Sequence, residues 1–127
     1  MNELSSSNSA YLKHHAQNPI YWKTWSEKTL DIALLENKLI ILSIGYSACH
    51  WCHVMERETF SNQPIASFMN QNFISIKVDR EEHPAVDNAY MDFIMETKGN
   101  GGWPLNCILM PDTTPLYAGT YFQTKQW

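Results

Sequence analysis

The sequence lacks the features of several large classes of protein. No apolar run approaches the roughly 20 residues that span a bilayer, and residues 1–8 lack the basic and apolar regions of a signal peptide. Lysine and arginine number nine against 13 aspartate and glutamate residues, which gives a net charge of −4 at pH 7. Because no basic excess would hold nucleic acid or an anionic membrane, we expect a cytoplasmic protein that binds neither.

Cysteine is also scarce, with three residues in a chain of 127. Cys49, Cys52 and Cys107 are too few for the disulfide framework of a small secreted domain. Cys107 precedes aliphatic residues in a predicted strand, which favours a small buried side chain over a reactive one. Cys49 and Cys52, however, have C-x-x-C spacing. In a reducing compartment such a pair is more often catalytic or metal-binding than structural.

The composition is sufficient for one packed domain, because 44% of the residues are hydrophobic. We therefore expect residues 1–127 to form a single domain. Residues 1–24 show no clean period of 2 or 3.6 and are predicted to be an irregular N-terminal extension, pinned to the body by aromatic side chains. A helix is predicted next, with Thr24 as its N-cap and Glu27 completing a capping box.

The later hydrophobic patterns predict an α/β domain. Residues 39–44 are almost wholly aliphatic, which is typical of a buried central strand, and residues 73–78 alternate as a strand does. The intervening helical residues form a crossover, so these two strands should be parallel. Residues 105–110 and 116–122 predict an antiparallel hairpin. Together these elements specify a small mixed sheet with flanking helices.

The C-x-x-C pair lies where the first predicted strand gives way to a helix. The N-terminal end of a helix lowers the pKa of a thiol, and the thiolate is the reacting species. Cys49 is therefore predicted to be a nucleophile, and Cys52, one turn further in, a resolving thiol. His50 beside Cys49 would add positive charge or shuttle a proton. This interpretation requires no cofactor beyond a redox-active Cys49–Cys52 disulfide.

Two other chemistries use the same spacing. A structural zinc site needs two more ligands, and the chain has no second C-x-x-C, although His53 is close enough in sequence to ligate. Cys49 through His53 also satisfies the C-x-x-C-H pattern of haem attachment. That pattern is short, and the flanking residues predict a strand that enters an α/β unit. Dithiol chemistry is therefore favoured over both alternatives.

Several stretches together resemble the spermatogenesis-associated thioredoxin-like family. The matching stretches are Tyr11-Leu12, His15-Ala16, Asn18-Pro19, residues 42–60, residues 76–82, residues 101–106 and residues 119–122. The resemblance implies a thioredoxin-like fold whose Trp103-Pro104 bond is cis, with Pro104 lying against the dithiol. It also implies a thiol–disulfide role toward a protein or small-molecule substrate.

The resemblance also implies that part of a longer protein is missing here. Family members continue into a large α-helical region, and the last helix of a thioredoxin normally follows the hairpin. Neither is present in the sequence, so we expect a fragment with one sheet face uncovered. Self-association through that face is the predicted consequence.

The sequence departs from thioredoxins in two ways. A buried acid precedes the first cysteine by six residues in thioredoxins, and Ser43 occupies that position here. The residues between the cysteines are His50-Trp51 rather than Gly-Pro. A more acidic nucleophile stabilises the reduced form, so we expect a couple more oxidising than thioredoxin, whose potential is about −270 mV.

Charged and aromatic residues near the motif extend the predicted site. Glu56, Arg57, Asp79 and Arg80 either line one surface and replace the missing acid, or are solvated. Trp51 and Trp103 form either an apolar docking surface or part of the core. A second hypothesis for the whole domain is non-catalytic. It would be a thioredoxin-like binding or scaffold module for the absent region, with regulatory or metal-holding cysteines.

Overall fold

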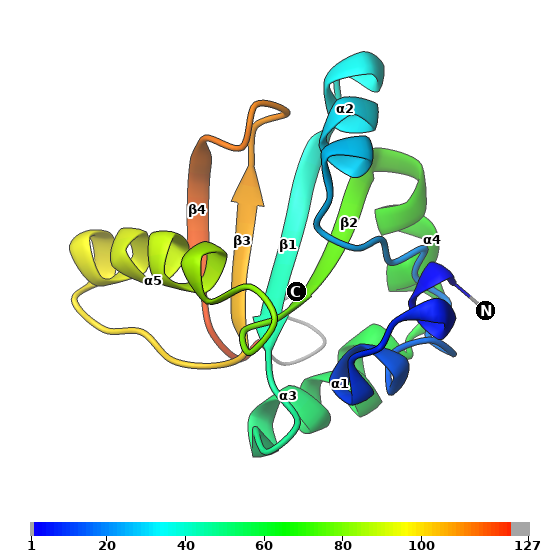
Figure 1. Cartoon of the computed structure of the whole chain (residues 1–127), viewed down its shortest axis with the longest axis horizontal. Coiled ribbons are helices and arrows are strands. Elements are labelled where there is room, and N and C mark those ends of the chain that lie inside the picture. The colour runs from blue at the N-terminus through cyan, green and yellow to red at the C-terminus, as the bar shows by residue number, and fades with distance from the viewer. Residues whose placement is uncertain (1, 123–127) are drawn as a thin grey trace.

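The computed structural model describes residues 2–122 and contains a four-stranded mixed sheet in the order β2-β1-β3-β4 (Figure 1). β1 (Leu39–Gly45) pairs in parallel with β2 (Phe73–Asp79) and antiparallel with β3 (Leu105–Leu109). β4 (Pro115–Gly119) pairs antiparallel with β3. The predicted α/β class and strand directions are confirmed, although β4 ends at Gly119 rather than at Phe122.

Helical segments lie on both faces of this sheet. The segments are η1 (Glu3–Ser6), α1 (Ala10–Lys13), α2 (Glu27–Glu36), α3 (His50–Met55), the π-helical turn η2 (Glu56–Phe60), α4 (Gln63–Asn72) and α5 (Pro84–Lys98). One core packs α2 and α5 on the sheet, and the other packs α1, α3, η2 and α4 against the opposite face. α1 and α3 lie together beyond the end of β1 in Figure 1. None of the helices among residues 2–122 is long and apolar enough to cross a membrane.

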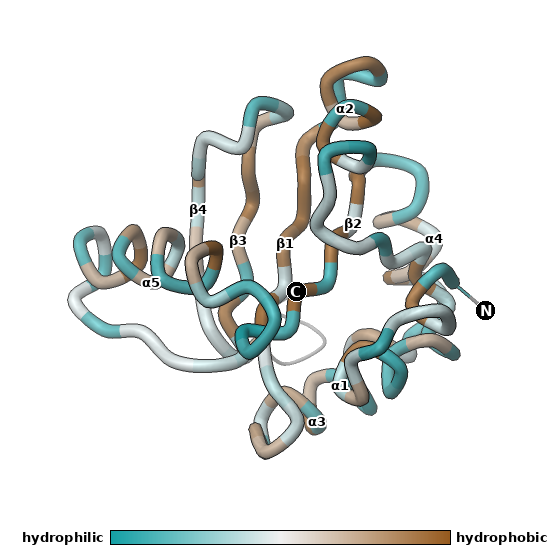
Figure 2. Tube along the Cα trace, in the orientation of Figure 1, coloured by the Kyte–Doolittle hydropathy of each residue, from teal (hydrophilic) through white to brown (hydrophobic). Residues whose placement is uncertain are grey.

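The two faces of the sheet differ in chemistry. Alternate residues of a strand point to opposite faces, so Ile40, Leu42 and Ile44 pack into the aliphatic core beside α2 and α5. The other face of β1 carries Ile41 and then Ser43, which lie beneath α1, α3 and α4. Figure 2 shows hydrophobic residues along β1 and β3 and on α2. Ser43 is therefore a buried polar residue on the sheet face that carries the cysteines.

The N-terminal residues are more regular than the sequence predicted. They contain η1 and α1, and Lys23 then forms an isolated parallel bridge with Ile76 on the edge of β2. The predicted N-cap of α2 is wrong. Ser26 is the cap, and its side chain accepts from the backbone N–H of Thr29, whereas Thr24 donates to the Glu3 carboxylate. The bridge at Lys23 keeps the chain extended past Thr24, so the helix begins later.

Candidate active site

A disulfide joins Cys49 and Cys52 at the junction between β1 and α3. Their Cα atoms lie 5.3 Å apart. Cys49 is the N-cap of α3, and its sulfur accepts a hydrogen bond from the backbone N–H of Cys52 at 3.2 Å. Cys49 is 5% exposed and Cys52 is 0% exposed. The sulfur nearer the surface is thus the one at the helix end, and the second lies behind it.

Backbone contacts fix the loop that leads into the disulfide. The Cys49 N–H donates to the Tyr46 carbonyl at 3.2 Å, and the Arg80 N–H donates to the Gly45 carbonyl at 2.9 Å. His53 Nε2 lies 2.6 Å from the Ser47 carbonyl, which can only accept, so this nitrogen carries the proton. His53 therefore braces the loop. Among residues 2–122, no group of three or more His, Cys, Asp or Glu side chains is placed to hold a metal ion.

Aromatic residues form a shallow cavity beside the motif. Trp51 is 52% exposed, and its ring lies 5.2 Å from that of His50 and 4.9 Å from that of Tyr121. Trp51 and Trp103 line the same cavity, which has a volume of about 330 Å³. The peptide bond between Trp103 and Pro104 is cis. The two tryptophans named from the sequence thus share one surface.

A buried carboxylate orients one wall of this cavity. Trp103 Nε1 donates to Asp87 Oδ1 at 2.8 Å, and Arg80 Nε lies 3.5 Å from Asp87 Oδ2. The Arg80 guanidinium stacks 4.4 Å from the Trp103 ring centroid and 5.5 Å from that of Tyr46. Asp87 is not among the site residues predicted from the sequence. Its position in the first turn of α5, just after the charged loop that contains Arg80, was the available signal.

The other charged residues named from the sequence have different surroundings. Glu56 accepts from the Asn18 side chain at 2.7 Å, and Asp79 accepts from Ser9 at 2.6 Å. Both carboxylates therefore tie the N-terminal residues to the body of the domain. Arg57 is exposed. The four charges do not line one common surface.

The position that holds an acid in thioredoxins is part of a buried polar pair here. Lys77 of β2 donates from Nζ to Ser43 Oγ at 2.8 Å. The same ammonium lies 5.2, 5.4 and 4.9 Å from the ring centroids of Tyr11, Trp22 and Phe60. Burial lowers the pKa of Lys77 to about 7. The alternation of residues 73–78 places Lys77 on one face with Ser75, and this was the overlooked signal.

The N-terminal residues also reach the active-site helix. The Tyr11 ring lies 4.8 Å from that of His15 and 6.4 Å from that of His53. His15 is buried, donates from Nδ1 to the Tyr11 carbonyl at 3.0 Å, and has a pKa held well below its usual range by burial. His14 packs its ring 5.7 Å from that of His53. This N-terminal segment packs in one core with Cys49 and Cys52 and forms a wall behind the disulfide.

Residues 1–127 match a family model whose name refers to a DsbH thioredoxin. Its description is a protein of unknown function, DUF255. The chain belongs to the DUF255 family. The DUF255 chain is 51% identical over 121 residues to an uncharacterized protein of Caenorhabditis elegans, covering 95% of the chain and 17% of that protein. It is 50% identical to human spermatogenesis-associated protein 20, covering 95% of the chain and 15% of that protein. The resemblance inferred from the sequence is confirmed, and the chain spans less than a fifth of these relatives.

Solved structures show the fold to be thioredoxin-like. A thioredoxin from Thermus thermophilus aligns with a TM-score of 0.67 at 13% identity, covering 85% of this DUF255 chain and 81% of that chain. A DsbH oxidoreductase aligns with a TM-score of 0.60 at 16% identity, covering 81% and 74%. Thioredoxin-like oxidoreductases use a cysteine disulfide rather than a bound cofactor, and the Cys49–Cys52 disulfide occupies the strand-to-helix junction here.

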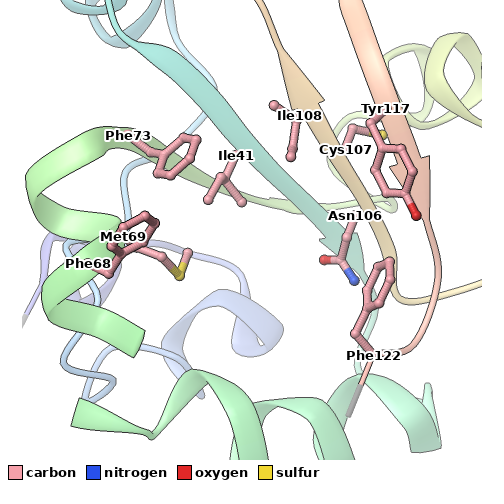
Figure 3. Close-up of a pocket in the computed structure, with 9 residues that line it drawn as sticks. All are labelled: Ile41, Phe68, Met69, Phe73, Asn106, Cys107, Ile108, Tyr117 and Phe122. Atoms are coloured by element: carbon pink, nitrogen blue, oxygen red, sulfur yellow. The ribbon is translucent and has the colours of Figure 1, made fainter. Parts of the chain in front are cut away.

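A second cavity of about 300 Å³ opens on the sheet between α4 and β4 (Figure 3). Its lining is largely apolar and comprises Ile41, Phe68, Met69, Phe73, Asn106, Cys107, Ile108, Tyr117 and Phe122. It shares no lining residue with the cavity beside Trp51. This face of the sheet is therefore hollowed and apolar among the described residues.

Proposed function

We propose that this chain is a thiol–disulfide oxidoreductase domain that uses Cys49 and Cys52. One observation carries the proposal: the two sulfurs form a disulfide at a helix start, with Cys49 nearer the surface and Cys52 buried behind it. Thiol–disulfide exchange proceeds by attack of a thiolate on a sulfur atom. A first sulfur nearer the surface and a second, fully buried sulfur suit the two successive attacks of that chemistry.

The reaction in the reducing direction has two balanced steps. The Cys49 thiolate attacks one sulfur of a substrate disulfide, which forms a mixed disulfide and releases the other substrate sulfur as a thiolate. The Cys52 thiolate then attacks Cys49 Sγ, closes the Cys49–Cys52 bond and releases the second substrate thiolate. Two electrons pass from the dithiol to the substrate, and the released thiolates take protons from water. The reverse sequence oxidises a substrate dithiol.

The cavity beside the disulfide suggests how a substrate would dock. Trp51 and Trp103 present exposed or half-buried aromatic surface there, and Asp87 and Arg80 hold Trp103 in place. Apolar aromatic walls suit a polypeptide segment or a small molecule that carries a disulfide. We place this activity in the cytoplasm. A couple whose potential lies above the glutathione poise of about −220 to −260 mV would remain largely dithiol there.

Cysteine substitutions in an insulin-reduction assay test the activity. Cys49→Ser should abolish turnover, and Cys52→Ser should accumulate a mixed disulfide because the second attack is lost. Cys107→Ser is the matched control, since Cys107 is buried in the other core and burial raises its pKa to about 12. Turnover unchanged by Cys49→Ser would contradict the proposal and favour the binding-module hypothesis.

The proposed potential requires a separate measurement. His50 stands beside the Cys49 N-cap and faces the ring of Trp51, so positive charge there would stabilise the reduced form. Equilibration with glutathione redox buffers should return a potential above thioredoxin's value of about −270 mV. A potential at or below that value would refute the oxidising assignment and leave the exchange activity intact.

A further inference from the structure

The Tyr11 hydroxyl is a buried polar group with no role in the two exchange steps described above. Tyr11 is 0% exposed, and its hydroxyl has no hydrogen-bond partner among residues 2–122. A buried hydroxyl without a partner is unfavourable, so native structures rarely leave one. The disulfide-bonded state of this protein therefore contains an unused donor.

This hydroxyl and the sulfur of Cys52 lie around one point next to Gly45. A Cβ atom built on Gly45 would fall 2.6 Å from Cys52 Sγ, and it would collide with the Tyr11 hydroxyl oxygen as well. The two atoms thus converge on the same point above the end of β1. Any residue larger than glycine at position 45 would push between them.

The surrounding contacts hold Tyr11 in this position. Ser9 caps α1 by accepting from the Leu12 N–H, and its own hydroxyl is bonded to Asp79 at 2.6 Å. The Tyr11 ring packs 4.8 Å from His15 and 5.2 Å from the Lys77 ammonium. The hydroxyl is therefore fixed by packing rather than free to turn elsewhere.

We propose that the Tyr11 hydroxyl donates a hydrogen bond to Cys52 Sγ in the reduced protein and stabilises the thiolate that resolves the mixed disulfide. This inference rests on the proposed function. Reduction breaks the Cys49–Cys52 bond and frees the Cys52 sulfur to turn toward the hydroxyl as a hydrogen-bond acceptor. In the resolving step that sulfur attacks Cys49 Sγ, the substrate leaves as a thiolate, and Tyr11 keeps its proton throughout.

The electrostatic surroundings suit a donor that never ionises. Burial, with the nearby charges of Asp79 and Glu56, raises the pKa of Tyr11, so the phenol remains protonated in the working pH range. Titratable groups on every packed element face the ring or contribute charge to it: His15, His53, Lys77, Asp79 and Glu56. Hydrogen bonds to charged groups are the stronger ones, so the bond should favour the thiolate over the thiol.

Removal of one oxygen atom tests the inference. Tyr11→Phe should shift the equilibrium with glutathione toward the Cys49–Cys52 disulfide by about tenfold, as expected for loss of a hydrogen bond to an ionised sulfur. The apparent pKa of the resolving step, measured from its pH–rate profile, should rise. Tyr90→Phe is the matched control. The Tyr90 hydroxyl donates to the Thr113 carbonyl in the opposite core, so its loss should change neither value.

The outcomes separate this inference from the proposed function. A wild-type protein that fails to equilibrate with glutathione would contradict the proposed function itself. A wild-type protein that equilibrates, with Tyr11→Phe unchanged in equilibrium and pH profile, would overturn the inference alone.

A measurement on the unaltered protein applies even if Tyr11→Phe does not fold. The hydroxyl proton of Tyr11, observed by NMR, should move downfield when the disulfide is reduced, because it gains an acceptor. An unchanged resonance on reduction would overturn the inference.

Discussion

A lysine and a serine form the buried polar pair behind the disulfide, and the serine stands where thioredoxins have an acid. Lys77 donates to Ser43 Oγ and is surrounded by three aromatic rings. Those rings favour the cation through their negative faces, whereas burial favours the neutral amine. Burial lowers the pKa of Lys77 to about 7, and the charge of Glu56 opposes this shift. The charge beneath the active-site helix should therefore change near neutral pH.

Lys77 should impose a pH dependence on stability. Its folded-state pKa of about 7 lies below its ordinary value of 10.5, so the unfolded chain binds more protons between these pH values. The free energy of unfolding should therefore rise with pH over this window, by up to about 1.4 kcal/mol per unit. Lys77→Met should flatten this rise in urea-unfolding series at pH 6.5 to 9.5.

Lys28→Met provides the control for that series, because Lys28 is exposed on α2. Its pH slope should match that of the wild type. A Lys77→Met slope equal to the wild-type slope would show that the ammonium is not destabilised by burial.

The residues that could be predicted from the sequence are those whose chemistry is local. Cys49 and Cys52 are three positions apart, so their spacing and the flanking strand and helix signals predict them together. Tyr11 and Lys77 are 66 positions apart and meet only through the packing of α1 on β2. No local pattern in either segment indicates that contact.

At the scale of elements, the capping of α2 shows where local prediction failed. The capping-box pattern at Thr24 is genuine as a sequence signal. Ser26 caps the helix instead, because Lys23 pairs with the edge of β2 and keeps the following residue extended. The strands were predictable because their aliphatic and alternating patterns agree with their final pairing. The helix start was not, because a tertiary bridge decides it.

Substitution of the two candidate caps measures this difference. Ser26→Ala should lower the free energy of unfolding by about 1 kcal/mol, since it removes the acceptor for the Thr29 N–H. Thr24→Ala should cost less, because its bonds to Glu3 are exposed. Chemical denaturation of both variants checks the order. A larger loss in Thr24→Ala would contradict the assigned cap.

At the scale of the whole molecule, the apolar cavity between α4 and β4 is a surface feature that the proposed reaction does not use. Large apolar patches on a protein surface commonly mark interaction sites. Phe68 and Tyr117, which line this cavity, are both exposed. We expect a second copy of the chain to cover this face when the domain is studied alone.

Sedimentation velocity tests this expectation. The wild-type chain should show a weight-average sedimentation coefficient that rises with concentration, and Phe68→Ser should reduce that rise. Phe68 is 62% exposed, so its replacement should leave the fold intact. Leu35→Ser on α2, outside the cavity lining, is the control and should sediment as the wild type does. A monomeric profile for the wild type at high concentration would contradict the expectation.

The pKa of the Cys49 thiol in the reduced chain tests the central claim most directly. The pH dependence of alkylation, followed by peptide mass analysis, reports that pKa separately for each cysteine. Cys49 at the N-cap of α3 should ionise below the ordinary thiol value of about 8.5 and react before Cys107. A Cys49 pKa at or above that value would contradict its assignment as the nucleophile.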